Sequence, residues 1–417
     1  MSAGHGKGPS KGKPRSPANP LDGPRARVGG KRIRHSGKGV GGAYYYVTGE
    51  LVADSGAVDD VLVALRRIDI AECPTTPVGD TGLVTIEVDA RTRIDQLVNL
   101  LSGPLAVEPN HVLTTHFHLG GLAVLRPQAV DPAKIATRPL KGRGECVTIG
   151  VIDSFFYDPV AAGHPSWATE GVDFDVVGAL PAERSTHSVT VGHGNAVVSI
   201  IKQLAPESRV VTATVATAKG DVPGTMSDTA LADAIERLLG EHRVHMLVLP
   251  LGGSTRSGAM PATARALDPY LGSTVVIASA GNSGDDPTVY PASDPDVVGV
   301  GAWKSSAMDL AYARGAAKVV LAPYAGLPKL ALAPWSNSGV CAQLAAPGVR
   351  VPAPFLTGTY TIEGGEKNTG DFVSKQNFKG WALFTGTSFA APIAAGVAAG
   401  AVGGSVPSVS DILEALF

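Results

Sequence analysis

Cysteine is scarce in this sequence. Only Cys73, Cys146 and Cys341 occur among 417 residues, and no two of them have C-x-x-C spacing. A disulfide scaffold and a cysteine zinc site are therefore excluded. Charged residues are also few, at 17%, whereas 44% of the residues are apolar and the chain holds 51 Gly and 31 Pro. This composition excludes a coiled coil and a wholly disordered protein, and at this length it predicts at least two globular units.

No long apolar segment follows the start of the chain. A secretory signal needs an apolar run of about 7 to 15 residues after its basic residues, and the sequence has none there. We therefore expect a cytoplasmic protein. Farther along, the uncharged segment Gly380–Ser410 is long enough to cross a bilayer, but glycine and proline interrupt it and its side chains are mostly alanine. It predicts a buried helix and no membrane span.

Acidic residues are nearly absent from the first forty positions. Residues 1–40 hold ten Lys or Arg and one acid, Asp22, for a net charge of +9, and the remaining 25 basic and 36 acidic residues give the rest of the chain −11. Because large apolar side chains are few here, we expect residues 1–42 to form a disordered basic tail. Its charge would attract an acidic partner such as nucleic acid, anionic lipid or the body of the same molecule; a solvated tail without a partner is the alternative.

The segment 43–126 has the pattern of a small α+β domain. Apolar residues recur at helical spacing in Val58–Leu65 and Ile94–Leu101, and they alternate in Leu83–Val88 as in a half-buried strand. Two more strands are expected between residues 112 and 125. They would complete a small sheet with helices on one face, in a ferredoxin-like arrangement.

The pattern changes after residue 126. Residues 127–145 combine proline, glycine and basic side chains, which predicts an exposed linker. In the segment 146–417, strands and helices alternate, starting with the apolar strand Val147–Ile152. This pattern predicts a mostly parallel sheet with helices on both faces, and in such sheets the loops at the carboxyl ends of the strands carry the chemistry.

Three polar residues stand where this fold places reactive groups. Asp153 follows the first strand, His193 stands between glycines where a helix begins, and Ser388 opens an alanine-rich helix. Each has an ordinary structural interpretation alone, as a turn residue, a surface loop residue and a helix cap. Together they supply a carboxylate, a base and a nucleophile, and a helix N-terminus provides N–H donors for a developing oxyanion.

The order of these residues and the motifs around them resemble the subtilisin-like serine proteases, or subtilases. The resemblance spans residues 146–404, and its motifs are Val191–Asn195, Leu251–Gly253, Ser279–Gly284, Tyr290–Ala292, Ala345–Gly348 and Gly386–Pro392. It implies a serine endopeptidase that forms an acyl-enzyme on Ser388. In this family's mechanism His193 would be the general base and then the general acid, Asp153 would orient it, and Asn282 would donate to the oxyanion.

The same resemblance implies where a peptide substrate binds. Leu251, Gly252 and Gly253 would pair with an extended peptide as an added strand, and Ala280 and Gly281 would form a wall of the first specificity pocket. Since such pairing engages the main chain more than side chains, it favours broad specificity.

Two positions depart from the family's usual motifs. Phe155 stands where a glycine is usual after Asp153-Ser154, and Asn195 replaces the threonine usual after His193-Gly194. The first predicts an altered loop near the substrate cleft. Neither change removes a catalytic group. His187 is a rival base, but it lacks the flanking glycines and the following helix.

The N-terminal segment 43–126 more loosely resembles the pro-domains of subtilases, which act as folding chaperones and inhibitors. The resemblance implies that this domain binds the protease in cis, that the chain after Leu125 passes through the active site, and that the linker 127–144 holds the cleavage point. An unrelated small α/β module docked on the enzyme is the alternative.

Metal binding stays open at this stage. His116 and His118 share a face of one expected strand with His111 nearby, but no carboxylate or cysteine accompanies them. Asp285-Asp286 and Asp294–Asp296 could offer oxygen ligands to a structural calcium ion, although EF-hand spacing is absent. The proposed chemistry requires no cofactor.

Two alternative functions stay open. One is a catalytically silent relative that holds peptides in the same groove, and the other is a scaffold that recruits an acidic partner through the tail.

Overall fold

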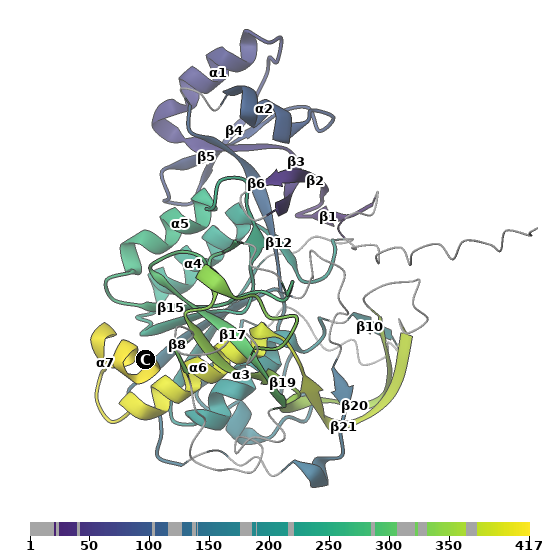
Figure 1. Ribbon diagram of the computed structural model, residues 1–417, viewed down its shortest axis with the longest axis vertical. Helices are drawn as coiled ribbons and strands as arrows, with labels where there is room; N and C mark the ends of the chain where they lie inside the picture. Colours follow the sequence, from purple (N-terminus) through teal and green to yellow (C-terminus); the bar gives the residue numbers. More distant parts are fainter. Residues whose placement is uncertain are drawn as a thin grey trace, which may run out of the picture.

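The chain forms a small N-terminal domain stacked on a larger α/β domain, as a computed structural model shows (Figure 1). The structure describes residues 21, 25–39, 42–101, 105–115, 127–135, 139, 141–175, 186–188, 190–215, 221–284, 288–306, 322–323, 332–363 and 373–417.

The N-terminal domain is built around strand β3. This strand pairs antiparallel with β2, β5 and β6, and β4 pairs with β5 at the sheet edge. Helices α1 and α2 bury their apolar stripes, including Val61, Leu65 and Val98, against Leu51 and Ile86 of the sheet. The elements are β2 (Lys31–Gly39), β3 (Gly42–Asp54), α1 (Val58–Arg66), β4 (Thr75–Val78), β5 (Leu83–Glu87), α2 (Ile94–Leu101) and β6 (Val107–Thr114).

A disordered tail over all of residues 1–42 is a wrong expectation. Residues 1–20 lie outside the described part of the chain, but β1 (Arg27–Val28) and β2 form an antiparallel hairpin. Apolar contacts anchor this hairpin to the domain: Leu21, Val28 and Ile33 pack against Tyr45 of β3. Few as they are, these side chains bury enough surface to order a basic segment.

The larger domain contains a sheet with the strand order β18-β19-β17-β15-β13-β8-β11-β9. All neighbouring strands run parallel except β18, which is antiparallel to β19. The strands are β8 (Thr148–Asp153), β9 (Val172–Asp173), β11 (Arg209–Thr214), β13 (Met246–Leu249), β15 (Val275–Ser279), β17 (Val297–Ser306), β18 (Ala322–Pro323) and β19 (Leu344–Val349).

Helices cover both faces of this sheet, as the alternating pattern predicts. Side chains of β8 show the division: Val151 joins the core beneath α3 (His193–Leu204), α6 (Thr387–Val402) and α7 (Val409–Leu416). Ile152 joins the opposite core beneath α4 (Asp228–Glu241) and α5 (Pro261–Leu267). Among the described helices, none has the length and apolar character that a membrane crossing requires.

The expected linker is partly docked on the larger domain. Its strand β7 (Gln128–Ala129) pairs with β21 (Val373–Phe384), which forms a long hairpin with β20 (Val351–Glu363). Strand β10 (Thr186–Ser188) completes this second sheet beside β20. Most of the described residues of this segment are exposed or partly exposed, as its composition predicts, and backbone pairing fixes Gln128–Ala129 on the larger domain.

Candidate active site

Asp153 and His193 meet at the carboxyl end of the main sheet. Asp153 is the last residue of β8, and His193 is the first residue of α3. His193 Nδ1 lies 2.6 Å from Asp153 Oδ2, and both side chains are buried. Asp153 Oδ1 accepts a hydrogen bond from the Ser154 backbone N–H at 2.7 Å. Both carboxylate oxygens are thus engaged, which fixes the carboxylate and through it the imidazole ring.

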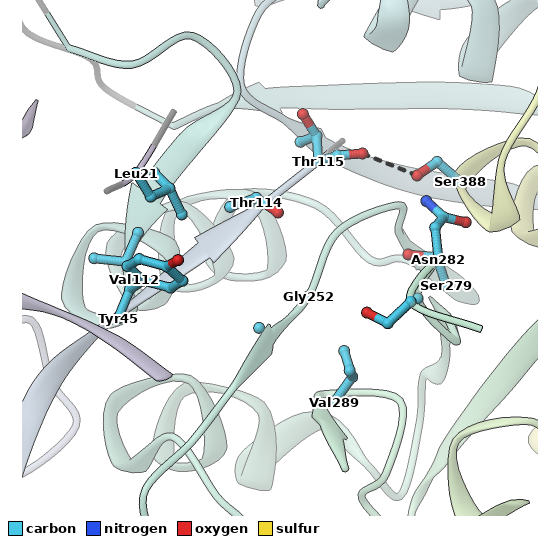
Figure 2. A pocket seen from close by; sticks show the side chains of 13 residues that line it. Leu21, Tyr45, Val112, Thr114, Thr115, Gly252, Ser279, Asn282, Val289 and Ser388 are labelled. Atoms are coloured by element: carbon cyan, nitrogen blue, oxygen red, sulfur yellow. Dashed lines mark hydrogen bonds between the residues drawn. The ribbon is translucent and has the colours of Figure 1, made fainter. Parts of the chain in front are cut away.

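Ser388 lies at the N-terminus of the buried helix α6. Its Oγ donates a hydrogen bond of 3.1 Å to the backbone carbonyl oxygen of Thr115, a residue of the N-terminal domain (Figure 2). The following residue, Phe389, contacts the His193 ring edge-on, with ring centroids 5.1 Å apart. The first turn of α6, which carries the Ser388 hydroxyl group, therefore also packs against the His193 imidazole.

The Asn282 side chain is oriented by the residue before the serine. Its Oδ1 accepts two hydrogen bonds from Thr387, from the backbone N–H and from Oγ1, each at 2.9 Å. Because Oδ1 is occupied on that side, the amide nitrogen is directed elsewhere, and Figure 2 shows it on the side of Ser388. This arrangement puts an N–H donor beside the serine hydroxyl group.

A strand of the N-terminal domain fills the cleft in front of Ser388. Thr114 exchanges two backbone hydrogen bonds with Gly252, at 2.9 and 3.0 Å. On the other side, β6 pairs antiparallel with β12 (Thr225–Ser227), and the Thr115 N–H donates to the Gly224 carbonyl at 2.9 Å. The expectation that the chain after Leu125 passes through the active site is therefore wrong, because β6 and Thr115 occupy that position.

Glycines allow this close approach of two backbones. A Cβ atom on Gly253 would lie 2.8 Å from the carbonyl oxygen of Val112, and one on Gly252 would lie 2.6 Å from a methyl carbon of Val289. A larger residue at Gly253 would therefore collide with the backbone of β6, and one at Gly252 would collide with Val289 beneath the pairing strand. Of the sequence-predicted substrate-binding residues, Gly252 and Gly253 thus contact or adjoin the added strand.

A pocket opens beside the hydrogen bond between Ser388 and Thr115. Its lining includes Gly252, Gly281 and Val289 (Figure 2). Leu251 and Ala280, also expected to bind substrate, are buried in the hydrophobic core behind this pocket. Their side chains serve packing, and neither residue lines the pocket.

The two departures from the family's motifs are linked through the loop that follows Asp153. The Asn195 side chain accepts from the Tyr157 backbone N–H at 3.1 Å and donates to the Tyr157 carbonyl at 2.9 Å. It thereby holds the loop that follows Asp153, and Phe155 lies in that loop. The rival base His187 lies on β10 against the ring of Tyr360, with centroids 4.9 Å apart, and it is His193 that contacts Asp153.

Polar side chains join the two domains around β6. Arg256 forms an ion pair of 2.8 Å with Glu108. His111 is fully buried, and its Nε2 accepts from the Arg256 backbone N–H at 3.1 Å. Burial, reinforced by the nearby Arg256 guanidinium, lowers the pKa of His111 to about 3. The sequence suggested His111 only as a possible metal ligand, because the interface roles of these residues depend on how the two domains dock.

The metal-binding candidates gain no support. Within the described part of the chain, no group of three or more His, Cys, Asp or Glu side chains is arranged to hold a metal ion. His111 instead packs in the domain interface, while His116, His118 and Asp285-Asp286 lie outside the described residues.

Comparison with known proteins decides the family. The model of the subtilase family of peptidases matches residues 144–410, which contain all of the site residues of the larger domain. The chain belongs to the subtilase family.

Solved subtilase structures are similar in fold. Fervidolysin from Fervidobacterium pennivorans, described as a keratinolytic enzyme related to subtilisin, superimposes with a TM-score of 0.52 at 17% identity, over 86% of this chain. The match spans only 55% of fervidolysin's own length. The self-cleaved protease domain of PatA shares 24% identity over 62% of this chain and 80% of its own, with a TM-score of 0.42.

A cold-adapted subtilisin-like serine proteinase shares 20% identity over 67% of this chain and 86% of its own, with a TM-score of 0.41. Among curated protein sequences the comparison finds no match. The family match and the similarity to fervidolysin show the subtilisin-like fold, whereas substrate and regulation have to be inferred from this chain's own residues.

Proposed function

We propose that this subtilase is a serine endopeptidase whose nucleophile is Ser388, with His193 as base and Asp153 as the orienting carboxylate. The observation that carries the proposal is the hydrogen bond from Ser388 Oγ to the carbonyl oxygen of Thr115. This contact supports the proposal, because it places the main-chain carbonyl of an extended segment at the serine hydroxyl, as peptide cleavage requires. The contact between His193 and Asp153 supplies the means of activating that serine.

The chemistry follows from these positions. Since Nδ1 of His193 faces Asp153, Nε2 is the atom that accepts the Ser388 proton as Oγ bonds to the carbonyl carbon of the substrate. The negative charge that forms on the carbonyl oxygen is stabilised by the Asn282 amide and the Ser388 backbone N–H. His193 then returns the proton to the leaving amine as the peptide bond breaks, and water hydrolyses the acyl-enzyme by the same sequence of proton transfers.

The N-terminal domain acts in this proposal as an inhibitor in cis. Strand addition on both sides of the cleft, to Gly252 and to β12, is how subtilases would hold a substrate. While β6 and Thr115 occupy these positions, another peptide cannot bind. Cleavage of the chain shortly after Thr115 would then free the domain, and its release would open the cleft.

Two measurements test the proposal. A fluorophosphonate probe should label the wild-type chain and leave the Ser388→Ala variant unlabelled, because only a nucleophilic serine reacts. Loss of that serine should lower turnover by about 10⁶, the magnitude known from subtilisin. Intact mass should show wild-type chains cut shortly after Thr115 and Ser388→Ala chains uncut. Equal labelling of both proteins, or an intact wild type that hydrolyses no peptide, would contradict the assignment.

A further inference from the structure

We infer that Asn337 is a positioning residue for the oxyanion donor Asn282, and this inference rests on the proposed peptidase function. Asn337 follows β18 in the chain and precedes β19, far in sequence from the catalytic motifs. Its side chain is fully buried, and it lies against the turn that carries Asn282.

Asn337 makes a hydrogen bond to the residue on each side of Asn282. Its backbone N–H donates to the Gly281 carbonyl at 2.9 Å. Its side-chain Oδ1 accepts from the Ser283 backbone N–H at 2.8 Å. One residue therefore fixes the backbone on both sides of Asn282. The next N–H in the turn, that of Gly284, donates to the backbone carbonyl of Trp335 at 2.8 Å.

The packing between Asn337 and the turn leaves no free space. Gly281 has a φ of +101°, and a Cβ atom there would lie 2.4 Å from Asn337 Nδ2. Only glycine combines that backbone conformation with so close an approach. The side chain of Asn337 thus sets the path of the backbone at Gly281 as well as its hydrogen bonds.

Asn337 is itself anchored to the central sheet. Ser336 Oγ accepts from the Ala302 N–H of β17 at 3.0 Å and donates to the Asn337 carbonyl at 3.1 Å. A continuous chain of hydrogen bonds therefore runs from β17 through Ser336 and Asn337 to the turn that carries Asn282.

Thr387 and Asn337 hold different parts of Asn282. Thr387 orients its side-chain amide, whereas Asn337 holds its main chain. Stabilisation of an oxyanion needs a donor about 2.7–3.1 Å from the developing charge. A small displacement of the backbone at Asn282 therefore weakens the hydrogen bond to the oxyanion in the transition state more than it weakens binding of the substrate. Loss of Asn337 should therefore lower kcat and leave KM nearly unchanged.

The test is a double-mutant cycle on the full-length chain, with turnover of a peptide anilide normalised to the concentration of fluorophosphonate-reactive serine. Asn282→Ala should lower kcat by about 10² to 10³, as loss of this donor does in subtilisin. Asn337→Ala should lower kcat about 10- to 100-fold with KM within about twofold of wild type. On the Asn282→Ala background, Asn337→Ala should change kcat by less than about twofold, because its effect passes through that amide.

A matched control separates positioning from simple loss of stability. Thr274 is buried at the opposite end of β15, and its Oγ1 donates to the Val244 carbonyl at 2.7 Å. Thr274→Val removes a buried hydrogen bond far from the turn and should leave kcat unchanged. The inference is overturned if Asn337→Ala matches wild type, or if it lowers kcat equally on both backgrounds. If wild type itself hydrolyses no peptide and binds no probe, it is the proposed function that fails.

Discussion

Acid should destabilise this protein through His111, which is buried where the two domains meet. Its ring lies 5.5 Å from that of Tyr44, and Arg256 and Glu108 are the charged groups beside it. Burial, reinforced by Arg256, lowers its pKa from 6.5 to about 3, so the folded protein keeps the imidazole neutral. The perturbation of interest is a drop from pH 7 to pH 5.

Proton uptake determines whether the free energy of unfolding rises or falls with pH. Between pH 6.5 and about 3 the unfolded chain binds a proton at His111 that the folded chain does not. Stability from this group is therefore complete above pH 6.5 and is lost progressively as the pH falls. At about 1.4 kcal/mol per pH unit well below the ordinary pKa, the loss between pH 7 and pH 5 comes to about 2 kcal/mol.

Urea unfolding of the full chain measures this loss. The protein should carry Ser388→Ala, so that it cannot cleave itself, and it should be compared with the same protein carrying His111→Gln. Glutamine retains an acceptor for the Arg256 N–H and does not titrate. Glu108, whose pKa burial raises, titrates in both proteins and cancels in the comparison. Equal loss of stability in the two proteins between pH 7 and pH 5 would refute the reasoning.

Three further substitutions have outcomes that the contacts predict. Asn195→Thr removes at least one of two buried hydrogen bonds to Tyr157 and should lower the free energy of unfolding by about 1–3 kcal/mol, measured by urea titration. Asp228→Ala removes the acceptor of three hydrogen bonds in the first turn of α5 and should cost about 2 kcal/mol in the same assay. Gly281→Ala should abolish most peptide turnover while circular dichroism stays native-like, because its Cβ would displace the turn that carries Asn282, the proposed oxyanion donor; unchanged turnover would contradict the close packing described above.

The sequence predicted those features that local context determines. Asp153 at a strand end and His193 at a helix start could be paired because parallel strands bring their carboxyl ends to one edge. The contact between them follows from the order of the elements. Ser388 was likewise marked by its helix start.

Features that depend on pairing between distant segments escaped prediction. The strand that fills the cleft, β6, ends at Thr114 just before Thr115, and nothing in its own residues distinguishes it from an ordinary edge strand. Asn337 resembles any polar loop residue until its contacts with Gly281 and Ser283 are seen. The hairpin of β1 and β2 was missed for another reason: net charge outweighed a handful of apolar side chains in the composition, although those side chains decide its packing.

The pairing of β6 with β12 makes one continuous sheet out of strands from both domains. If the N-terminal domain is released as proposed, β12 and the backbone at Gly252 lose their pairing partner together. Two rows of unsatisfied amide and carbonyl groups would then face water, a condition that promotes association between protein molecules. While the N-terminal domain is docked, β6 satisfies these groups; after its proposed release, an extended substrate peptide would satisfy them again by pairing in its place.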